Sequence, residues 1–203
     1  MALAPPNPES GTDIFLWKHG EDDYQATFSA SKTWDQLRVK KPKVAWSRVV
    51  WFSQGVPRFS FITWLTVKNR LSTGDRMRQR GLVQGCVLCG ERDETKDHLF
   101  FACPYSYTVW EGLASRLMGR GINLDWHWTI NCLQRLGEKR MDTILAKMLL
   151  QSVIYHLWRK RNARRHHQTW TTTDQLRRVI DKAVRNKIVS LRYKFDHKYG
   201  GLL

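Results

Sequence analysis

Four residues with metal-binding side chains lie within a stretch of eighteen positions. Cys86 and Cys89 are separated by two residues, and His98 and Cys103 are separated by four. Two cysteines this close can hold one ion on a tight turn, and thiolate and imidazole groups are ligands that Zn²⁺ prefers. The set fills all four positions of a tetrahedral ion and leaves none for water, which is typical of structural zinc. The spacing therefore predicts a structural Zn²⁺ site at Cys86, Cys89, His98 and Cys103.

The residues around these ligands support the same interpretation. Gly85 and Gly90 bracket the first pair and tolerate unusual backbone dihedral angles. The apolar residues 99–101 lie between the second pair, and we expect them to pack as a small core. The alternative is a set of buried cysteines near a core histidine, which does not explain why the ligands come in pairs. Cys132 and the pair at 166–167 fit packing or a basic helix face better than a second metal site.

The hydrophobic pattern predicts a mostly α-helical fold with a small β-hairpin near the N-terminus. Short alternating runs on either side of residues 20–23 indicate the hairpin. Apolar residues at helical spacing predict helices at 33–37, 46–71 with an interruption at Gly55 and Pro57, 76–80, 105–118, 126–136, 139–165 and 174–198. We therefore expect a helical domain built around a zinc knuckle, residues 86–103, and followed by long basic C-terminal helices.

The formal net charge of +16 is concentrated in two blocks. Residues 36–85 contain 11 basic residues and 1 acidic residue, and residues 158–203 contain 13 and 3. The knuckle between them contains 2 basic and 4 acidic residues. Clustered cations attract polyanions whatever the fold, so nucleic acid is the leading partner. Basic residues that merely coat solvated helix faces are the alternative.

Two groups of cations are the candidate phosphate contacts. One lies near the end of the helix predicted at 139–165, where the helix dipole also favours positive charge. The group on this helix consists of Arg159, Lys160, Arg161, Arg164 and Arg165. The other group consists of Lys40, Lys41 and Lys43. Because no base-specific pattern is evident, we predict salt-sensitive, weakly selective binding to RNA or single-stranded DNA. Exposed aromatic residues could stack on unpaired bases, although the helical spacing around Trp46, Trp51 and Trp64 favours core packing.

Several motifs occur in an order that resembles a known family. An aromatic block runs from Trp46 to Trp64 and includes P-R-F-S-F; it is followed by R-L-S-T-G-D-R at 70–76, the three-Cys, one-His string and Trp110. Over residues 14–118 this arrangement resembles the reverse-transcriptase zinc-binding domain, found toward the C-terminus of plant LINE-type (non-LTR) retrotransposon polyproteins. The segment W-R-K-R-N at 158–162 is similar to the W-x-x-R-N segment that commonly follows this domain.

The resemblance implies a zinc module without catalytic activity. No Tyr-x-Asp-Asp polymerase motif is present, and the basic blocks contain too few acidic residues for a two-metal nuclease or RNase H site. We expect a disordered lead at 1–13, the zinc-binding domain at 14–118 and a helical basic extension at 119–203. The expected function is that of a non-catalytic nucleic-acid-binding module derived from a LINE-type element.

A zinc-stabilised protein-interaction or scaffold module without nucleic-acid binding is the competing class. Apolar residues from Leu176 to Phe195 recur at helical spacing and predict a stripe that docks on a protein partner or on a second copy. No apolar run has the length of a membrane span, and the first residues do not resemble a secretory signal. We therefore expect an intracellular protein, with the nucleus favoured over the cytoplasm because of the basic clusters.

Overall fold

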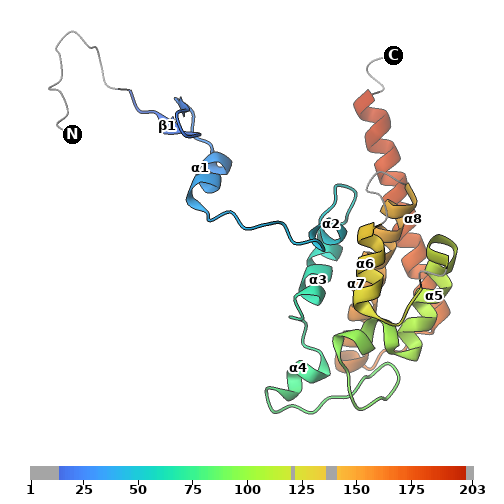
Figure 1. Cartoon of the computed structure of the whole chain (residues 1–203). Helices are drawn as coiled ribbons and strands as arrows, with labels where there is room; N and C mark the ends of the chain where they lie inside the picture. Colours follow the sequence, from blue (N-terminus) through green and yellow to red (C-terminus); the bar gives the residue numbers. More distant parts are fainter. Residues whose placement is uncertain (1–13, 120–121, 136–140, 200–203) are drawn as a thin grey trace, which may run out of the picture. The chain divides into compact units, whose positions relative to one another are not determined.

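The computed structural model describes residues 14–119, 122–135 and 141–199 (Figure 1). The lead expected at 1–13 lies outside these residues. Contacts within the chain group its residues into two compact units, one that ends at Lys43 and one that begins at Val44. We call them the N-terminal unit and the helical unit. The helical unit contains both the zinc knuckle and the C-terminal helices.

From residue 14 onward, the described part of the N-terminal unit is a short hairpin followed by one helix. Strand β1 (Trp17–Lys18) pairs antiparallel with β2 (Tyr24–Gln25), which confirms the predicted hairpin. Helix α1 (Ala30–Leu37) begins after Ser29, whose hydroxyl accepts a hydrogen bond from the Lys32 N–H at 3.4 Å. Serine is a favoured N-cap for this reason. The cap starts the helix ahead of the predicted position 33.

The helical unit begins with three short helices, passes through the zinc knuckle and ends with four helices. The region predicted to be helical at 46–71 contains two separate helices. The first ends before Trp51, and the second begins at Pro57. The elements are α2 (Ser47–Val50), α3 (Pro57–Val67), α4 (Gly74–Arg78), the π-helical turn η2 (His98–Ala102), α5 (Pro104–Met118), α6 (Trp126–Arg135), α7 (Met141–His167) and α8 (Thr173–Tyr199). The mostly α-helical fold is confirmed, with each helix of the C-terminal half close to its predicted bounds.

Helix α7 is the centre of the helical unit. It contacts α2, α3, α5, α6 and α8, and it is buried on more than one side. Its Gln151 is 1% exposed and is fully engaged: the amide nitrogen donates to the carbonyl oxygens of Val49 and Val50 at 3.1 and 2.7 Å, and the amide oxygen accepts from the Ser60 hydroxyl at 3.1 Å. These bonds fix α2 and α3 against α7, because a buried amide is costly unless its polar groups are paired.

Helix α8 packs on α5 and α7, and this corrects one prediction. Leu176 and Ile180 are 5% and 0% exposed and belong to the same hydrophobic core as α5 and α7. The first half of the stripe predicted for a partner therefore faces this chain's own core. The Arg177 side chain of α8 lies against Gly112 of α5, where a Cβ atom would be 2.7 Å from the guanidinium. The side chain of Phe195 lies outside the described part of the structure.

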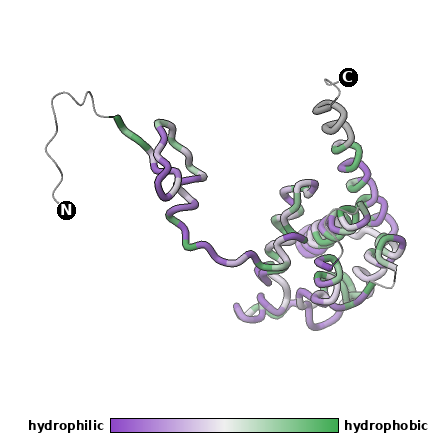
Figure 2. Tube along the Cα trace, turned by 45° about the horizontal axis from the view of Figure 1, so that its top comes forward, coloured by the Kyte–Doolittle hydropathy of each residue, from purple (hydrophilic) through white to green (hydrophobic). Residues whose placement is uncertain are grey.

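The backbone traces in Figure 2 show hydrophilic residues predominating in the segment between α1 and α2, which carries the expected contacts Lys40, Lys41 and Lys43. All three lysines are exposed. Among the described residues, none of the helices combines the length and the apolar composition that crossing a lipid bilayer requires.

Candidate metal centre and the helix that supports it

The structure brings the four predicted ligands into one cluster. The Sγ atoms of Cys86, Cys89 and Cys103 and a ring nitrogen of His98 all lie within 4.8 Å of one another. The Sγ atoms of Cys86 and Cys103 are 3.9 Å apart, and Cys89 Sγ is 3.2 Å from His98 Nε2. Two sulfur atoms bound tetrahedrally to Zn²⁺ at about 2.3 Å lie about 3.8 Å from each other. The donor set and its spacing therefore fit a structural Zn²⁺ ion with four protein ligands.

A π-helical turn explains how His98 and Cys103 meet. Side chains five residues apart on an α-helix point about 140° away from each other. Here the Cys103 N–H donates to the His98 carbonyl at 2.7 Å, which closes a wider turn and returns Cys103 to the side of His98. The sequence pattern indicated the ligands but not this turn, because two residues with four residues between them do not lie on one face of an α-helix.

The first ligand pair lies on a glycine-dependent turn. Gly90 has φ +86°, and its N–H donates to the Cys86 carbonyl at 2.8 Å. At Gly85 a Cβ atom would lie 2.7 Å from the Glu91 carbonyl oxygen, which accepts from the Cys86 N–H at 2.8 Å. Both glycines are therefore required, one for its left-handed backbone and the other for the close approach of two chain segments.

An aromatic core backs the metal centre. Leu99, Phe100 and Phe101 are all 0% exposed, which confirms that the residues between the second ligand pair pack as a core. The Phe101 ring lies 5.8 Å from Trp110 of α5 and 5.6 Å from Trp126 of α6, measured between centroids. The knuckle is therefore an integral part of the helical unit, because its apolar residues pack on two of the neighbouring helices.

The cysteines of the cluster differ in acidity. A hydrogen bond from the Cys86 thiol lowers the pKa of Cys103 to about 5, and the same contact raises the pKa of Cys86. Backbone N–H groups of Ser106 and Tyr105, at the start of α5, also lower the pKa of Cys103. Helix N-termini stabilise thiolates in this way. Cys103 therefore provides the first thiolate, the form in which cysteine binds a metal ion.

A buried carboxylate links the knuckle to α7. Glu94 lies between the two ligand pairs in sequence and is 0% exposed. Its Oε1 accepts from Arg161 Nη2 at 2.6 Å and from the Gly74 N–H at 3.1 Å. Arg161 is 2% exposed, and its Nη2 also donates to the Ser72 carbonyl at 2.9 Å. The ion pair thus ties together the zinc knuckle, the start of α4 and the basic end of α7.

Arg161 is also the arginine of the W-x-x-R-N segment, and the structure explains that pattern. The Arg161 guanidinium lies 5.0 Å from the centroid of the Trp158 ring and donates to Asn162 Oδ1 at 3.1 Å. The other two residues of the pattern, Trp158 and Asn162, therefore both contact the arginine that neutralises Glu94. In the sequence, the spacing of tryptophan, arginine and asparagine in this pattern was the signal that could have distinguished Arg161 from the other cations of α7.

Two further cations of this group are buried against the knuckle. Arg164 is 9% exposed and donates from Nη1 to the carbonyl oxygens of Val87 and Leu88 at 3.3 and 3.0 Å. These two carbonyls lie inside the turn between Cys86 and Cys89. Arg165 is half-buried and donates to the Gly85 carbonyl at 3.0 Å. Helix α7 therefore holds the backbone of the first ligand pair through its arginine side chains.

The predicted phosphate contacts on α7 need correction for this reason. Lys160, Arg161 and Arg164 are each less than a tenth exposed, and Lys160 donates to the Thr169 carbonyl at 2.7 Å. Burial lowers the pKa of Lys160, with a contribution from the nearby charge of Arg164. Arg159 is exposed. The five cations do not form one surface, because four of them, all except Arg159, bond to the knuckle, to the turn that begins it or to the loop after α7.

The three tryptophans for which helical spacing predicts core packing also differ in exposure. Trp46 and Trp64 are half-buried, and Trp46 packs against the hydrophobic core, with the Lys68 ammonium 5.3 Å from its ring centroid. Trp51 is 50% exposed. Helical spacing therefore predicted burial correctly at Trp46 but not at Trp51, which lies where the chain leaves α2.

Comparison with known proteins adds one finding. Residues 28–110 match a family model described as zinc-binding in reverse transcriptase. No curated protein and no solved structure matches the chain. The matched residues include the four ligands and Glu94 but end before Arg161. The matched family is a zinc-binding accessory region rather than a catalytic one. This chain therefore contains a segment that matches the zinc-binding region of reverse transcriptases, with a complete set of candidate zinc ligands.

Proposed function

We propose that this chain is a zinc-stabilised, non-catalytic nucleic-acid-binding module, derived from a LINE-type retrotransposon of plants, and that it binds RNA or single-stranded DNA. The observation that carries the proposal is the excess of exposed cations on the segment that leads into the knuckle. Residues 36–85 contain 11 basic residues and one acidic residue, Asp75. A surface of this kind attracts polyanions and makes binding dependent on salt.

The proposed interface is formed by α3, by the segments that follow α3 and α4, and by the C-terminal third of α7. Its exposed cations are Arg58, Lys68, Arg70, Arg80 and Arg159. Arg58 and Arg159 lie near each other, because their guanidinium groups are 5.4 and 5.8 Å from the centroid of the same Tyr155 ring. The exposed Lys40, Lys41 and Lys43 extend the basic sequence and remain proposed contacts. The same clusters are the basis for proposing a nuclear location.

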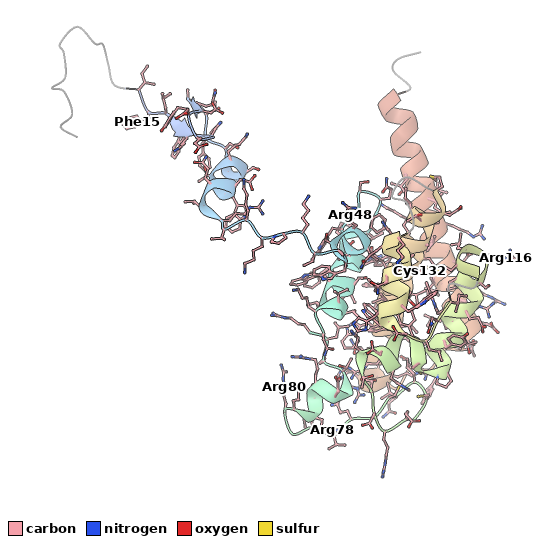
Figure 3. All side chains as sticks on the ribbon, viewed as in Figure 1. Phe15, Arg48, Arg78, Arg80, Arg116 and Cys132 are labelled. Carbon is pink, nitrogen blue, oxygen red and sulfur yellow. The ribbon has the colours of Figure 1, made fainter. Side chains whose placement is uncertain are left out.

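A charge-matched comparison tests the interface. One variant carries Lys68→Gln, Arg70→Gln and Arg80→Gln, and the control carries Arg116→Gln, Arg178→Gln and Lys182→Gln on α5 and α8, where all three side chains are exposed. Figure 3 shows Arg80 and Arg116 on opposite sides of the helical unit. Both variants lose the same charge, so a difference between them reports on location rather than on net charge.

Salt-titrated binding to a short single-stranded RNA is the measurement. Each phosphate contact contributes about 0.7 to the slope of log affinity against log salt for single strands, so loss of three contacts should reduce the slope by about 2. The control should keep the slope of the unmodified chain. Equal slopes for all three proteins, or the same reduction in both variants, would refute the interface.

A specific observation favours protein interaction as a second candidate. The N-terminal unit exposes large apolar side chains: Phe15 is 90% exposed, Trp34 63% and Leu37 77%, and α1 buries none of its residues. Large apolar side chains that stay exposed can take part in association when they lie on one surface. Self-association that persists at high salt, and that Phe15→Asp with Leu37→Asp abolishes, would support this function. A monomer at all salt concentrations would exclude association between copies.

A further inference from the structure

The loop between α7 and α8 presents one tryptophan to solvent next to a buried arginine. Trp170 is 75% exposed. The Arg164 guanidinium carbon lies 4.5 Å from the centroid of the Trp170 ring and 4.5 Å from the centroid of the Tyr105 ring. We call these three side chains the Trp170 platform. One side of the indole is held by a cation–π contact, while most of its surface remains accessible to water.

Hydrogen bonds hold the platform in place. The Tyr105 hydroxyl donates to the Thr171 carbonyl at 2.9 Å, and Arg164 Nη2 donates to the same oxygen at 3.3 Å. The Thr172 N–H donates to Gln175 Oε1 at 3.1 Å, and the Gln175 N–H donates to Thr172 Oγ1 at 3.2 Å. These bonds restrain the backbone beside Trp170, which reduces the conformational entropy that the loop loses when a ligand binds.

The platform lines a pocket that is open to solvent and has a volume of about 400 Å³. This volume lies within the range of small-molecule sites. The other lining residues are Thr171, Thr172, Thr173 and Gln175. Several of their polar groups are already engaged in the bonds described above. The pocket therefore offers a flat aromatic surface over a cation and little capacity to discriminate between hydrogen-bonding patterns.

We propose that an unpaired nucleobase of the bound nucleic acid stacks on Trp170. Every base has a π-face, so stacking tolerates any sequence, as expected of a site without base-specific hydrogen bonds. The cation beneath the indole draws electron density from the ring and favours an electron-rich purine on the opposite face. This inference deepens the proposed function for polymeric ligands, but the stacking site itself can be tested with a mononucleotide.

The platform is also joined to the metal centre. Arg164 donates to the Val87 and Leu88 carbonyls of the zinc turn with one nitrogen and to Thr171 of the loop with the other. One side chain thus connects the ligand turn to the stacking surface.

Binding of the full, zinc-loaded chain to two oligomers of equal length and charge tests the proposal. One is a single-stranded RNA and the other is an abasic strand that offers phosphates without bases. Trp170→Ala should weaken RNA binding roughly fivefold to hundredfold and leave abasic binding unchanged. Trp170→Phe should retain most of the preference for RNA. The control Trp128→Ala, at an indole that is 39% exposed on α6, should change neither.

A second measurement separates this inference from the proposed function. The Trp170 indole N–H signal, assigned by its loss in Trp170→Phe, should shift saturably when adenosine monophosphate is added. If RNA binds but neither the affinity of Trp170→Ala nor the indole signal changes, the stacking site is refuted and the nucleic-acid function stands. If the indole signal shifts but no oligomer binds, the proposed nucleic-acid-binding function is refuted, while Trp170 still stacks on a free base. If the indole signal does not shift and no oligomer binds, both the stacking site and the nucleic-acid function are refuted. This result is expected if the chain is a protein-interaction module.

Discussion

Glu94 of the zinc knuckle and Arg161 of α7 form an ion pair that is almost completely buried, with 2.6 Å between Oε1 and Nη2. The two residues are 67 positions apart in sequence. Their pairing means that the segment containing the ligands and the long basic helix stabilise each other. Removing one member of such a pair leaves an uncompensated charge in a dry environment.

We predict that Glu94→Gln destabilises the chain by about 3–5 kcal/mol, because Arg161 then remains buried without its counterion. Asp93→Asn is the matched control, since Asp93 pairs with Arg78 on the surface and both side chains are about half-exposed or more. Its effect should stay below about 1 kcal/mol. Urea unfolding of the zinc-loaded proteins measures both values. A Glu94→Gln variant as stable as Asp93→Asn would show that the ion pair does not stabilise the fold.

A fragment that ends at residue 118 should fail to hold its knuckle. It keeps all four ligands and Glu94 but lacks Arg161, Arg164 and Arg165, whose bonds support Glu94 and the turn at 85–88. We expect residues 44–118 to bind less zinc per chain and to be cleaved more readily within 86–103 than residues 44–203. The longer fragment controls for loss of the N-terminal unit. Equal zinc content and equal resistance to cleavage in the two fragments would contradict the supporting role of α7.

Removal of zinc should open the knuckle and leave most helices in place. Four protein ligands close the coordination shell, so the metal stabilises the turns of residues 86–103, while α5, α7 and α8 keep their apolar contacts. Limited proteolysis with and without a chelator should show new cleavage within 86–103. Cys103→Ser should behave like the chelated chain, whereas Cys132→Ser, a cysteine outside the cluster, should resist cleavage. Unchanged resistance after chelation would exclude structural zinc.

The buried His156 should make stability depend on pH. Burial, together with the charges of Arg159 and Arg58, lowers the pKa of His156 to about 4 from its ordinary value of 6.5. The unfolded chain therefore takes up the proton first as the pH falls. The stabilising contribution is fully present above about pH 6.5 and is lost progressively toward pH 4.

The loss should amount to about 1–2 kcal/mol, after allowance for partial access of water to the half-buried ring. Urea unfolding of the unmodified chain and of His156→Gln near neutrality and near pH 5 measures it, because the substituted residue cannot take up a proton. Zinc ligands also titrate in acid, but they do so in both proteins, so the difference isolates His156. Parallel pH profiles for the two proteins would contradict this assignment.

Much of the metal centre and of the helix order could be predicted from the sequence. Cys86, Cys89, His98 and Cys103 have side chains of one chemical class at short spacing, and short-range geometry is encoded locally. Apolar residues at helical spacing likewise located α5, α6 and α8 within a residue or two of their bounds.

The roles of the cations on α7 were decided only by the tertiary structure. Arg159 and Arg161 have the same charge and lie two residues apart on one helix, yet one is exposed and the other is 2% exposed. The difference depends on Glu94, which is 67 positions away in sequence and pairs with Arg161 in the folded chain. Net charge and helical periodicity are properties of a local segment. The partner that turns a surface cation into a buried one comes from a distant segment, and only packing brings the two together.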